Sequence, residues 1–532
     1  MMYKQFIRLL FSLWALVLFS ACNKDFLDKG PLDQYSDANV WTDSTLLMRY
    51  VDGIYGSIHS IYDDAGSWLP MDITDEGKAA RSFLICNQIN NGQYNSSDNI
   101  YQDRWQDVYA NVRKCNQFMA HLEDMPLSEQ LKQRLVGEVR FLRALNYMQP
   151  YSLFGPFPIV DKVLTLKDEL AIPRGTAEAC VAFINEDLEA AAAALPVQYA
   201  ESTDLGRATR GACLGMQCRL LLNDKDYAGA AKAAKAVMGL GVYQLFEGGY
   251  AEMFYPENDD NVEVIFNKEY AGDLSNQVHD LDLYDNSSFF TGFSSLVDVP
   301  TQNMVDNYEM TDGKTAAESD SYNPEHPYEN RDPRFYASII YDGASWLGNT
   351  MDLIKGSKYN PTSRPSPTGY MLRKFLNPNY AFNESSNSNY QNCIMLRLSE
   401  IYLNYAEAEF KLGNIEEARI YVNKIRSRKG VDMPEIPPGQ MTWEKYVRER
   451  TVELAFEGQR FNDIRRWEMG PALIGADIKA MLVQQADGKR QYTVTSLEKR
   501  YFDPKMYYFP IPKGELNKYP AGKVLEQNPG WD

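Results

Sequence analysis

Apolar residues recur three and four positions apart through most of the first half of the chain, which predicts a largely helical structure. Asp43, or Thr42 before it, can cap the first of these helices. Pro150 is expected to end the third, because proline cannot donate the next backbone hydrogen bond. The predicted helices cover residues 46–58, 105–122, 128–147 and 177–195.

Two later segments, 207–240 and 396–430, repeat one pattern of helix, short polar turn and helix. When they are aligned, Ala230 and Ala418 fall at the same position. Small residues there allow the two helices of a pair to approach closely, and the polar turn caps the second helix. Both segments look like tetratricopeptide-type hairpins. The pattern therefore predicts an all-α fold, an α-α superhelix of helical hairpins with long irregular loops and minor β pieces.

The stretch 443–467 carries carboxylates on one helix and arginines on the next. Glu449, Glu453 and Glu457 stand four residues apart, so they share a helix face that is expected to run to Gly458. Arg460, Arg465 and Arg466 follow on a second short helix. Such a cluster could form a catalytic or anion-binding site. An internal ion-pair clamp is the favoured interpretation, since arginine is the usual partner of carboxylates where helices meet.

Two long zones, 63–100 and roughly 247–392, lack helical periodicity and are rich in aromatic, amide and aspartate residues. Short strand-like pieces occur at 262–270 and 334–341. Long loops within compact domains are commonly functional, and aromatic content of this kind is atypical of disorder. We expect these loops to lie over the helical scaffold.

The loops contain candidates for binding a sugar, because a flat ring can stack on the C–H face of a pyranose while amides and arginines bond its hydroxyls. For any single aromatic residue the alternative is simple packing within the loop. Candidates in the first zone are Trp68, Arg81, Phe83 and Tyr94. Candidates in the second zone are Tyr284, Phe289, Phe290, Phe293, Tyr322 and Trp346.

The N-terminal segment has the pattern of a secretory signal. Lys4 and Arg8 precede an apolar run that is too short to span a bilayer. Small residues then lead directly to Cys22, which resembles the lipobox of bacterial lipoproteins. That resemblance implies removal of residues 1–21 and attachment of lipid to Cys22, which would tether the folded body to a membrane. An ordinary secretory signal followed by a chance cysteine is the alternative.

The overall composition restricts the partners and the chemistry. A net charge of -18 over 532 residues makes nucleic acid and anionic lipid surfaces poor partners. Beyond Cys22, six cysteines show no C-x-x-C spacing, so no disulfide framework is predicted and buried free thiols are expected. The four histidines are scattered, which is typical of structural surface residues and not of a metal site.

Sequence motifs give no support for catalysis or for a cofactor. No phosphate loop, nucleophile elbow or zinc-protease motif occurs. Clustered aspartates and asparagines could hold a structural calcium ion, although no twelve-residue calcium loop is present. Its candidate ligands are Asp259, Asp260, Asp282 and Asp285, with Asn258, Asn261 and Asn286 beside them.

Several segments together resemble the RagB/SusD family of nutrient-binding surface lipoproteins, over nearly the whole mature chain. The last three segments are the most specific. The matching segments are DFLD (25–28) after Cys22, GEVRFLRA (137–144) followed by LFGPFPIV, RLSEIYLNYAEAEFKLG (397–413), ERTVELAFEGQRFNDIRRW (449–467), PIPKGEL (510–516) and LEQNPGW (525–531).

This resemblance implies four tetratricopeptide-like hairpins in one compact unit, formed by residues 22–246 and 247–532. It also implies a non-catalytic protein on the outer face of the outer membrane, which passes oligosaccharides to a SusC-like TonB-dependent transporter. Some members of the family bind peptides instead. A helical glycosidase, which requires two carboxylates across a cleft, and a purely structural envelope lipoprotein are the rival hypotheses.

Overall fold

The computed structural model describes residues 40–270, 278–292, 296–379, 389–520 and 525–532. The predicted signal peptide, Cys22 and the DFLD segment lie outside these residues. None of the helices in the described part combines the length and apolar character needed to cross a membrane.

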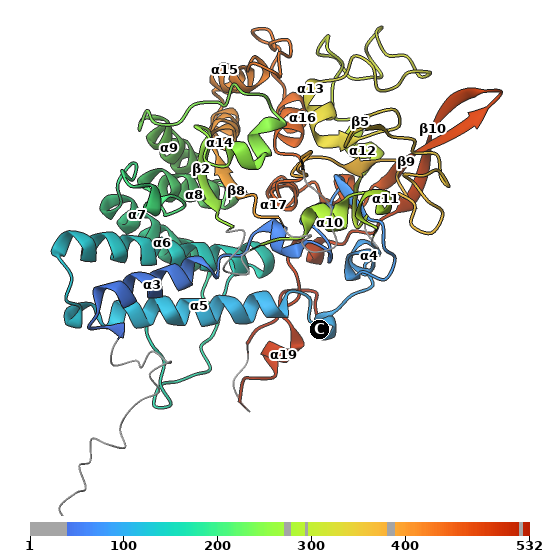
Figure 1. The fold of residues 1–532 in the computed structure, drawn as a ribbon. Coiled ribbons are helices and arrows are strands. Elements are labelled where there is room, and N and C mark those ends of the chain that lie inside the picture. Colours follow the sequence, from blue (N-terminus) through green and yellow to red (C-terminus); the bar gives the residue numbers. More distant parts are fainter. Residues whose placement is uncertain (1–39, 271–277, 293–295, 380–388, 521–524) are drawn as a thin grey trace, which may run out of the picture.

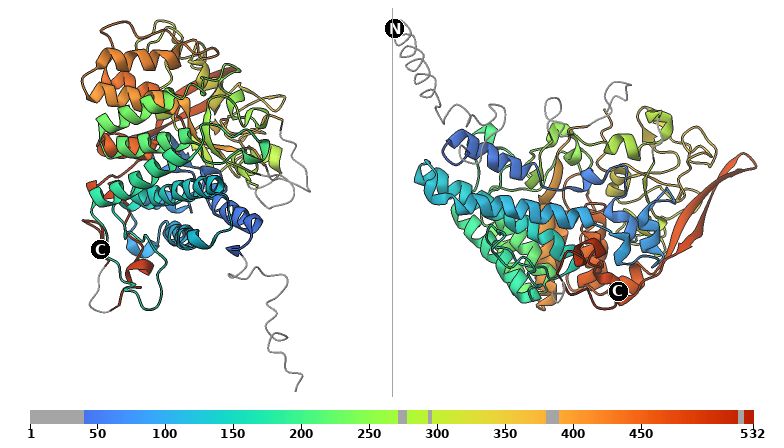
Figure 2. Two further views of the ribbon diagram at one scale, coloured as in Figure 1. Left: turned by 90° about the vertical axis from the view of Figure 1, so that its left-hand side faces the viewer. Right: turned by 90° about the horizontal axis from the view of Figure 1, so that it is seen from below.

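One half of the molecule is a curved row of helices, each packed against the next (Figures 1 and 2). Helix α3 lies against α6, and α9 connects the N-terminal hairpins to the C-terminal one by packing against α14. Together these helices bury one large hydrophobic core. Their bounds are α3 Ser44–Tyr55, α5 Gln102–Ala120, α6 Glu129–Phe154, α7 Ala177–Ala194, α8 Arg210–Asn223, α9 Tyr227–Met238, α14 Leu398–Lys411 and α15 Ile415–Arg426.

The repeated segments form the expected antiparallel hairpins, α8–α9 and α14–α15. The side chain of Asp226 caps α9 by accepting a hydrogen bond from the Gly229 amide. A Cβ atom at Gly215 would lie 2.4 Å from the Leu396 side chain, so the glycine allows this helix to pack closely on the strand that contains Leu396 without moving that side chain. The predicted all-α fold class is confirmed.

Two predicted helix ends were wrong. Helix α6 passes through Pro150 and is closed by Gly155. Gly155 has a positive φ, and its backbone N–H donates a hydrogen bond to the Tyr151 carbonyl. Proline removes only one hydrogen bond of a long, well-packed helix, so packing outweighs the loss. Helix α16 ends at Glu453, and Glu457 lies in the turn that follows it. Phe456 and Gly458 are the left-handed residues of that turn.

The other half consists of the two irregular zones and the C-terminal segment, held around a second core of mainly aromatic and aliphatic side chains. Its strands form five two-stranded antiparallel pairs, and the hairpin of β9 and β10 projects from the body (Figure 1). The pairs are β1 Gly77–Ala79 with β3 Asp298–Pro300, β2 Val264–Lys268 with β8 Cys393–Arg397, β4 Ile339–Ile340 with β7 Met371–Leu372, β5 Ser345–Trp346 with β6 Asn349–Thr350, and β9 Asp477–Ala486 with β10 Lys489–Lys499.

Short helices connect these strands. The strand expected at 262–270 is present as β2, but most of the segment 334–341 is helix α13, because Asp332 caps it and Pro333 begins it. The short helices are α4 Ile85–Asn90, α10 Leu281–Asp285, α11 Ser288–Thr291, α12 Gln302–Val305, α13 Pro333–Ser338, α16 Trp443–Glu453, α17 Arg460–Arg466, α18 Gly470–Leu473 and α19 Lys513–Leu516.

Candidate functional site

Strands β1 and β3 join the two irregular zones, which are far apart in the sequence. Beyond their ladder, the Ala80 amide donates to the Val297 carbonyl at 2.7 Å, and the Val297 amide donates to the Tyr284 carbonyl at 3.1 Å. Three backbone segments therefore run side by side. Arg81, which follows β1, is thereby placed near Tyr284 and Asp285 of α10, and Phe83 follows two residues later in the chain.

An aromatic patch of four residues, Phe289, Phe290, Lys358 and Tyr359, lies at the surface of the second zone. The ring of Phe290 stacks on Tyr359 with centroids 5.7 Å apart, and Phe289 meets Tyr359 edge to face at 5.1 Å. The Lys358 ammonium lies 3.9 Å from the centre of the Phe289 ring. Phe289 is 43% exposed. Phe290 is half-buried and Tyr359 is buried, so the open surface consists of the Phe289 ring and the Lys358 ammonium. An exposed ring beside a cation provides the mixed apolar and polar surface that a sugar requires.

Three further candidates lie on the joined loops. The Tyr284 ring packs over Gly66, where a Cβ atom would come within 2.7 Å of the ring. Phe83 is 75% exposed, and Arg81 is half-buried. Burial and the neighbouring Arg364 lower the pKa of the Arg81 guanidinium. These side chains and the aromatic patch are the sugar-binding candidates that remain open to solvent.

The other candidates are covered by protein. Trp68 and Tyr94 belong to a small aromatic core in which Tyr94 lies 4.7 Å from Trp531. Trp346 is 2% exposed, and its indole N–H donates to the Asn286 amide oxygen at 2.7 Å. The ring faces of these three side chains are packed in this structure. Their predicted contact with ligand remains untested.

Two aromatic candidates of the second zone remain, Tyr322 and Phe293. Tyr322 is half-buried beneath Arg331, and the Arg331 Cζ lies 5.4 Å from the centre of the Tyr322 ring. Phe293 lies outside the described residues. Tyr322 is therefore another partly covered ring, and neither residue joins the aromatic patch.

Beneath the joined loops, Asp72, Asp285 and Asp298 form a buried carboxyl triad. All three side chains are inaccessible to solvent. One oxygen of Asp298 accepts the Leu69 amide at 2.9 Å, and one of Asp285 accepts the Asp298 amide at 3.0 Å. The remaining oxygens of the triad have no hydrogen-bond donor in the described part of the chain.

Burial raises the pKa of each carboxyl group in the triad, and the neighbouring triad carboxylates raise those of Asp72 and Asp285 further. Arg500 is the cation that acts on Asp72, but its guanidinium donates to the carbonyls of Thr74 and Gly77. The triad is therefore most stable when it retains protons.

A second charged region, the arginine clamp, pairs Glu449, Glu453, Glu457 and Glu263 with buried cations. Glu453 alone accepts bonds from Arg334 at 2.9 Å, Arg397 at 2.7 Å and Arg428 at 2.9 Å. Burial on its own would raise the pKa of Glu453, but the guanidiniums hold it well below its usual value. The predicted internal clamp is confirmed. The further members of the clamp are Arg426 and Lys374.

The partners within the 443–467 stretch differ from those expected. Arg460 binds Asp75 of the first irregular zone through two bonds of 2.8 and 2.7 Å, and does not bind the carboxylates of α16. Arg466 donates to Glu407 at 2.8 Å. Its neighbour Arg465 donates to the Ser152 carbonyl and to the side-chain oxygen of Asn462. The stretch therefore joins the helical half to the first irregular zone.

Other titratable groups have structural surroundings. The six described cysteines are free and buried, as expected. His279 is buried, contrary to the surface position expected, and burial lowers its pKa to about 4. Asp282 accepts the Asn377 amide at 3.0 Å, while Asp259 accepts the Asn392 amide at 3.1 Å. Within the described ranges no cluster of three or more histidine, cysteine or acidic residues could hold a metal ion. Calcium binding remains an untested prediction.

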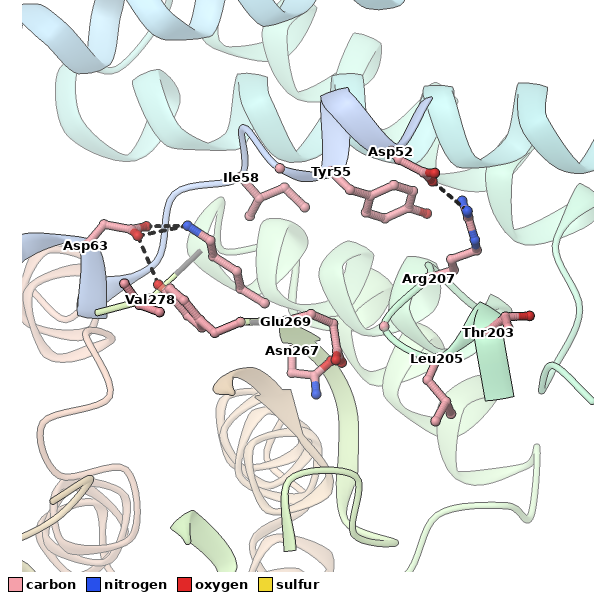
Figure 3. Close-up of a pocket in the computed structure, with 14 residues that line it drawn as sticks. Asp52, Tyr55, Ile58, Asp63, Thr203, Leu205, Arg207, Asn267, Glu269 and Val278 are labelled. Carbon is pink, nitrogen blue, oxygen red and sulfur yellow. Dashed lines mark hydrogen bonds and ion pairs between the residues drawn. The ribbon is translucent and has the colours of Figure 1, made fainter. Parts of the chain in front are cut away.

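Two adjoining clefts lie between the helical half and the irregular half. The first, of about 400 Å³, has an ion pair at each end (Figure 3). Arg207 meets Asp52 at 2.5 Å, and Lys268 meets Asp63 at 2.7 Å. Ile58, Asp63 and Lys268 also line the second cleft.

Sequence reasoning missed Lys358, Tyr359 and all residues of the clefts. The signal for Lys358 and Tyr359 was available, since a lysine and a tyrosine precede an Asn-Pro turn within a zone already identified as aromatic. The cleft residues gave no such signal, because they come from several helices, loops and strands, where single polar residues are indistinguishable from ordinary surface positions.

Comparisons with known proteins agree with the fold. The model of the SusD family matches residues 262–531, and a second family model, described as starch-binding associating with outer membrane, matches residues 25–222. The crystal structure of a SusD-like protein from Bacteroides fragilis superimposes with a TM-score of 0.82 and 32% identity, covering 94% of this chain and all of that one.

Two further relatives extend the comparison. A SusD-like carbohydrate-binding protein from Bacteroides fragilis has a TM-score of 0.80 and 26% identity, over 90% of this chain and 99% of that chain. A SusD-like protein of Formosa agariphila is 24% identical over 486 residues, which is 84% of this chain and 86% of the relative.

Proposed function

The chain belongs to the SusD family, and we propose that it is a non-catalytic glycan-binding lipoprotein of the cell surface. In this role it captures an oligosaccharide outside the outer membrane and delivers it to a SusC-like TonB-dependent transporter. Cys22 carries the lipid that anchors it. Support for the ligand class comes from the carbohydrate-binding relative and from the starch-binding description of the second family model.

The observation that carries this proposal is the aromatic patch, together with the exposed Phe83 on the loop that follows β1. A ring that is packed at one edge and open on one face can stack on a pyranose without first being ordered. Phe289 is held by Phe290 and Tyr359, so its exposed face has a defined position. Arg81 and Lys358 supply donors for the hydroxyl groups.

The absence of catalysis is supported by the state of the acids. A glycosidase needs two carboxyl groups that face substrate across a cleft. The carboxylates of the arginine clamp are buried and bonded to guanidiniums, and those of the triad are inaccessible to solvent. Neither set can reach a sugar in this arrangement.

The test is a titration of the soluble chain, from residue 23 onward, with a panel of neutral oligosaccharides followed by calorimetry. Replacing Phe83 and Phe289 together by alanine is expected to weaken binding about 5- to 150-fold, since ring stacking contributes about 0.5 to 1.5 kcal/mol for each ring. Leu482→Ala is the matched control, because Leu482 is 41% exposed but lies on the projecting hairpin.

Unchanged affinity in the double variant would reject the aromatic patch as the binding site. Conversion of any oligosaccharide to shorter products during the titration would reject the non-catalytic role. Binding of tetra-alanine in place of every sugar would move the protein to the peptide-binding members of the family.

A further inference from the structure

The second cleft, of about 410 Å³, is lined by an unusual number of side-chain amides and is called the amide cleft here. Its walls come from the end of α3, from α5, α6 and α8, from β8, and from the start of α17. Residues matched by both family models therefore meet in it. No residue of the aromatic patch lines it. The amides that line it are Asn111, Asn146, Gln149, Asn223, Gln459 and Asn462.

Four of these amides are oriented by the protein. Asn111 donates to the Asn146 side-chain oxygen at 3.2 Å. The side-chain oxygen of Asn462 accepts from Ser152 at 2.7 Å, and that of Asn223 accepts from Arg466 at 3.3 Å. Because these oxygens are occupied, the NH₂ groups of Asn223 and Asn462 are the ends available for a ligand.

Gln149 and Gln459 are the two amides without a side-chain hydrogen bond to any described residue. Both are partly buried, Gln149 on α6 and Gln459 just before α17. Each can donate two hydrogen bonds and accept two. They enter the cleft from opposite halves of the molecule, so one ligand can contact both.

The charged groups of the amide cleft are largely compensated within the protein. Arg219 forms a two-bond pair with Glu400 at 2.8 and 2.6 Å. Arg104 pairs with Asp64, outside the cleft lining, and Lys268 pairs with Asp63 at 2.7 Å. Asp107 and His59 complete the charged lining, with Asp107 exposed to solvent and His59 next to the Arg104–Asp64 pair. An anionic ligand would have to break one of these pairs, and Asp107 adds a further negative charge that disfavours it.

The remaining lining is apolar, from side chains such as Ile58, Val108 and Met395. A surface that combines neutral amides with aliphatic groups matches a sugar, whose hydroxyls alternate with C–H groups. We propose that the amide cleft binds one neutral sugar unit, as a second glycan site separate from the aromatic patch. This inference rests on the proposed glycan-binding function.

The experiment titrates the soluble chain with maltoheptaose and with laminarihexaose, and compares trigalacturonate and tetra-alanine as charged and peptide probes. The test variant combines Gln149→Leu with Gln459→Leu, which replaces both amides by aliphatic side chains of similar volume. The control combines Gln484→Leu with Gln491→Leu, an exposed cross-strand pair on the β9–β10 hairpin. Circular dichroism checks that both variants fold.

We expect the test variant to bind a neutral oligosaccharide about 5- to 150-fold more weakly, since two hydrogen bonds are lost, while the control binds as the wild type does. A crystal soaked with that oligosaccharide should show a sugar ring between Gln149 and Gln459. Both results together support the inference.

The alternative outcomes separate the two proposals. If the glutamine variant binds every oligosaccharide as the wild type does, while the Phe83 and Phe289 double variant binds more weakly, the amide cleft is rejected and the proposed function stands. If only trigalacturonate or tetra-alanine responds to the glutamine substitutions, the neutral-sugar assignment is overturned. If the wild type binds neither neutral oligosaccharide, both proposals fail for these two glycans, and the inference is withdrawn.

Discussion

The arginine clamp and the carboxyl triad are two buried acidic regions with opposite electrostatics. In the clamp, Glu453 is completely buried yet its pKa is far below normal, because three guanidiniums surround it. In the triad, Asp72 is equally buried, but its pKa is raised well above normal, first by burial and then by the neighbouring Asp298 carboxylate. Burial alone therefore does not decide the charge of a carboxyl group; its neighbours do.

The two regions also differ in position. The clamp lies where α14 and α16 meet α13 and β2, and its ion pairs connect these elements of the scaffold. The triad lies under the joined loops that carry Arg81, Phe83 and Tyr284. The scaffold is thus stabilised by ionised acids, and the loop junction by acids that retain protons.

The largest effect is expected from Glu453→Ala in the clamp. The substitution leaves Arg334, Arg397 and Arg428 short of a shared partner, and an uncompensated buried charge costs about 3 to 5 kcal/mol. Urea denaturation at pH 7 measures the free energy of unfolding. Glu444→Ala is the control, since Glu444 pairs with Arg448 but its side chain is 80% exposed. This substitution should change stability by less than about 0.5 kcal/mol. Equal effects of the two substitutions would contradict the role assigned to the clamp.

Arg460→Ala should have the next largest effect, because it leaves the Asp75 carboxylate buried without its two bonds. We expect a loss of about 3 kcal/mol and a lower melting temperature. Ligand affinity of the folded fraction should be unchanged, since Arg460 is buried and lines neither the aromatic patch nor the amide cleft. A selective loss of affinity at unchanged stability, measured by calorimetry beside a thermal melt, would show that Arg460 itself takes part in ligand binding.

Asp298→Asn should act in the opposite direction and depend on pH. The pKa of Asp298 is higher in the folded protein than in the unfolded chain, where it is about 4. The protonated carboxyl therefore contributes fully to stability below about pH 4, and this contribution is lost as pH rises through the pKa of the folded protein. The asparagine keeps the acceptor for Leu69 and carries no charge. We therefore expect a gain of about 1 kcal/mol or more at pH 8 and little change at pH 4.

Urea denaturation at both pH values measures this difference. Glu453→Gln in the clamp is the comparison, and its loss should persist at pH 8 and shrink only as pH falls below about 4, through the lowered pKa of the carboxyl. A destabilisation by Asp298→Asn that is the same at pH 4 and pH 8 would show that the triad carries no excess of protons.

The smallest effect on stability is expected above the triad, at Phe83. Because this ring is 75% exposed, Phe83→Ala should change the free energy of unfolding by less than about 0.5 kcal/mol. Its effect should appear in oligosaccharide affinity instead. A large loss of stability would mean that the loop junction depends on the ring, and it would weaken the distinction between scaffold and binding loops.

The sequence by itself determined the helical scaffold and the family. Helical periodicity located the hairpins of α8–α9 and α14–α15, since an amphipathic pattern depends only on local spacing. The three glutamates of the 443–467 stretch indicated an internal clamp for the same reason. The same local pattern predicted wrong ends for α6, which continues past Pro150, and for α16, which ends before Glu457. At both ends, packing of neighbouring elements outweighs the local conformational preferences of the sequence.

Only the tertiary structure decided which residues lie together and which are covered. Trp68, Tyr94 and Phe83 have the same appearance in the sequence, yet the first two are in a core and Phe83 is in solvent. The pairing of β1 with β3 joins segments that are more than two hundred residues apart in the chain. Burial, cross-chain partners and the pKa values that follow from them depend on long-range packing, which periodicity and composition do not record. For this reason the scaffold could be predicted from the sequence, while the triad, the aromatic patch and the amide cleft could not.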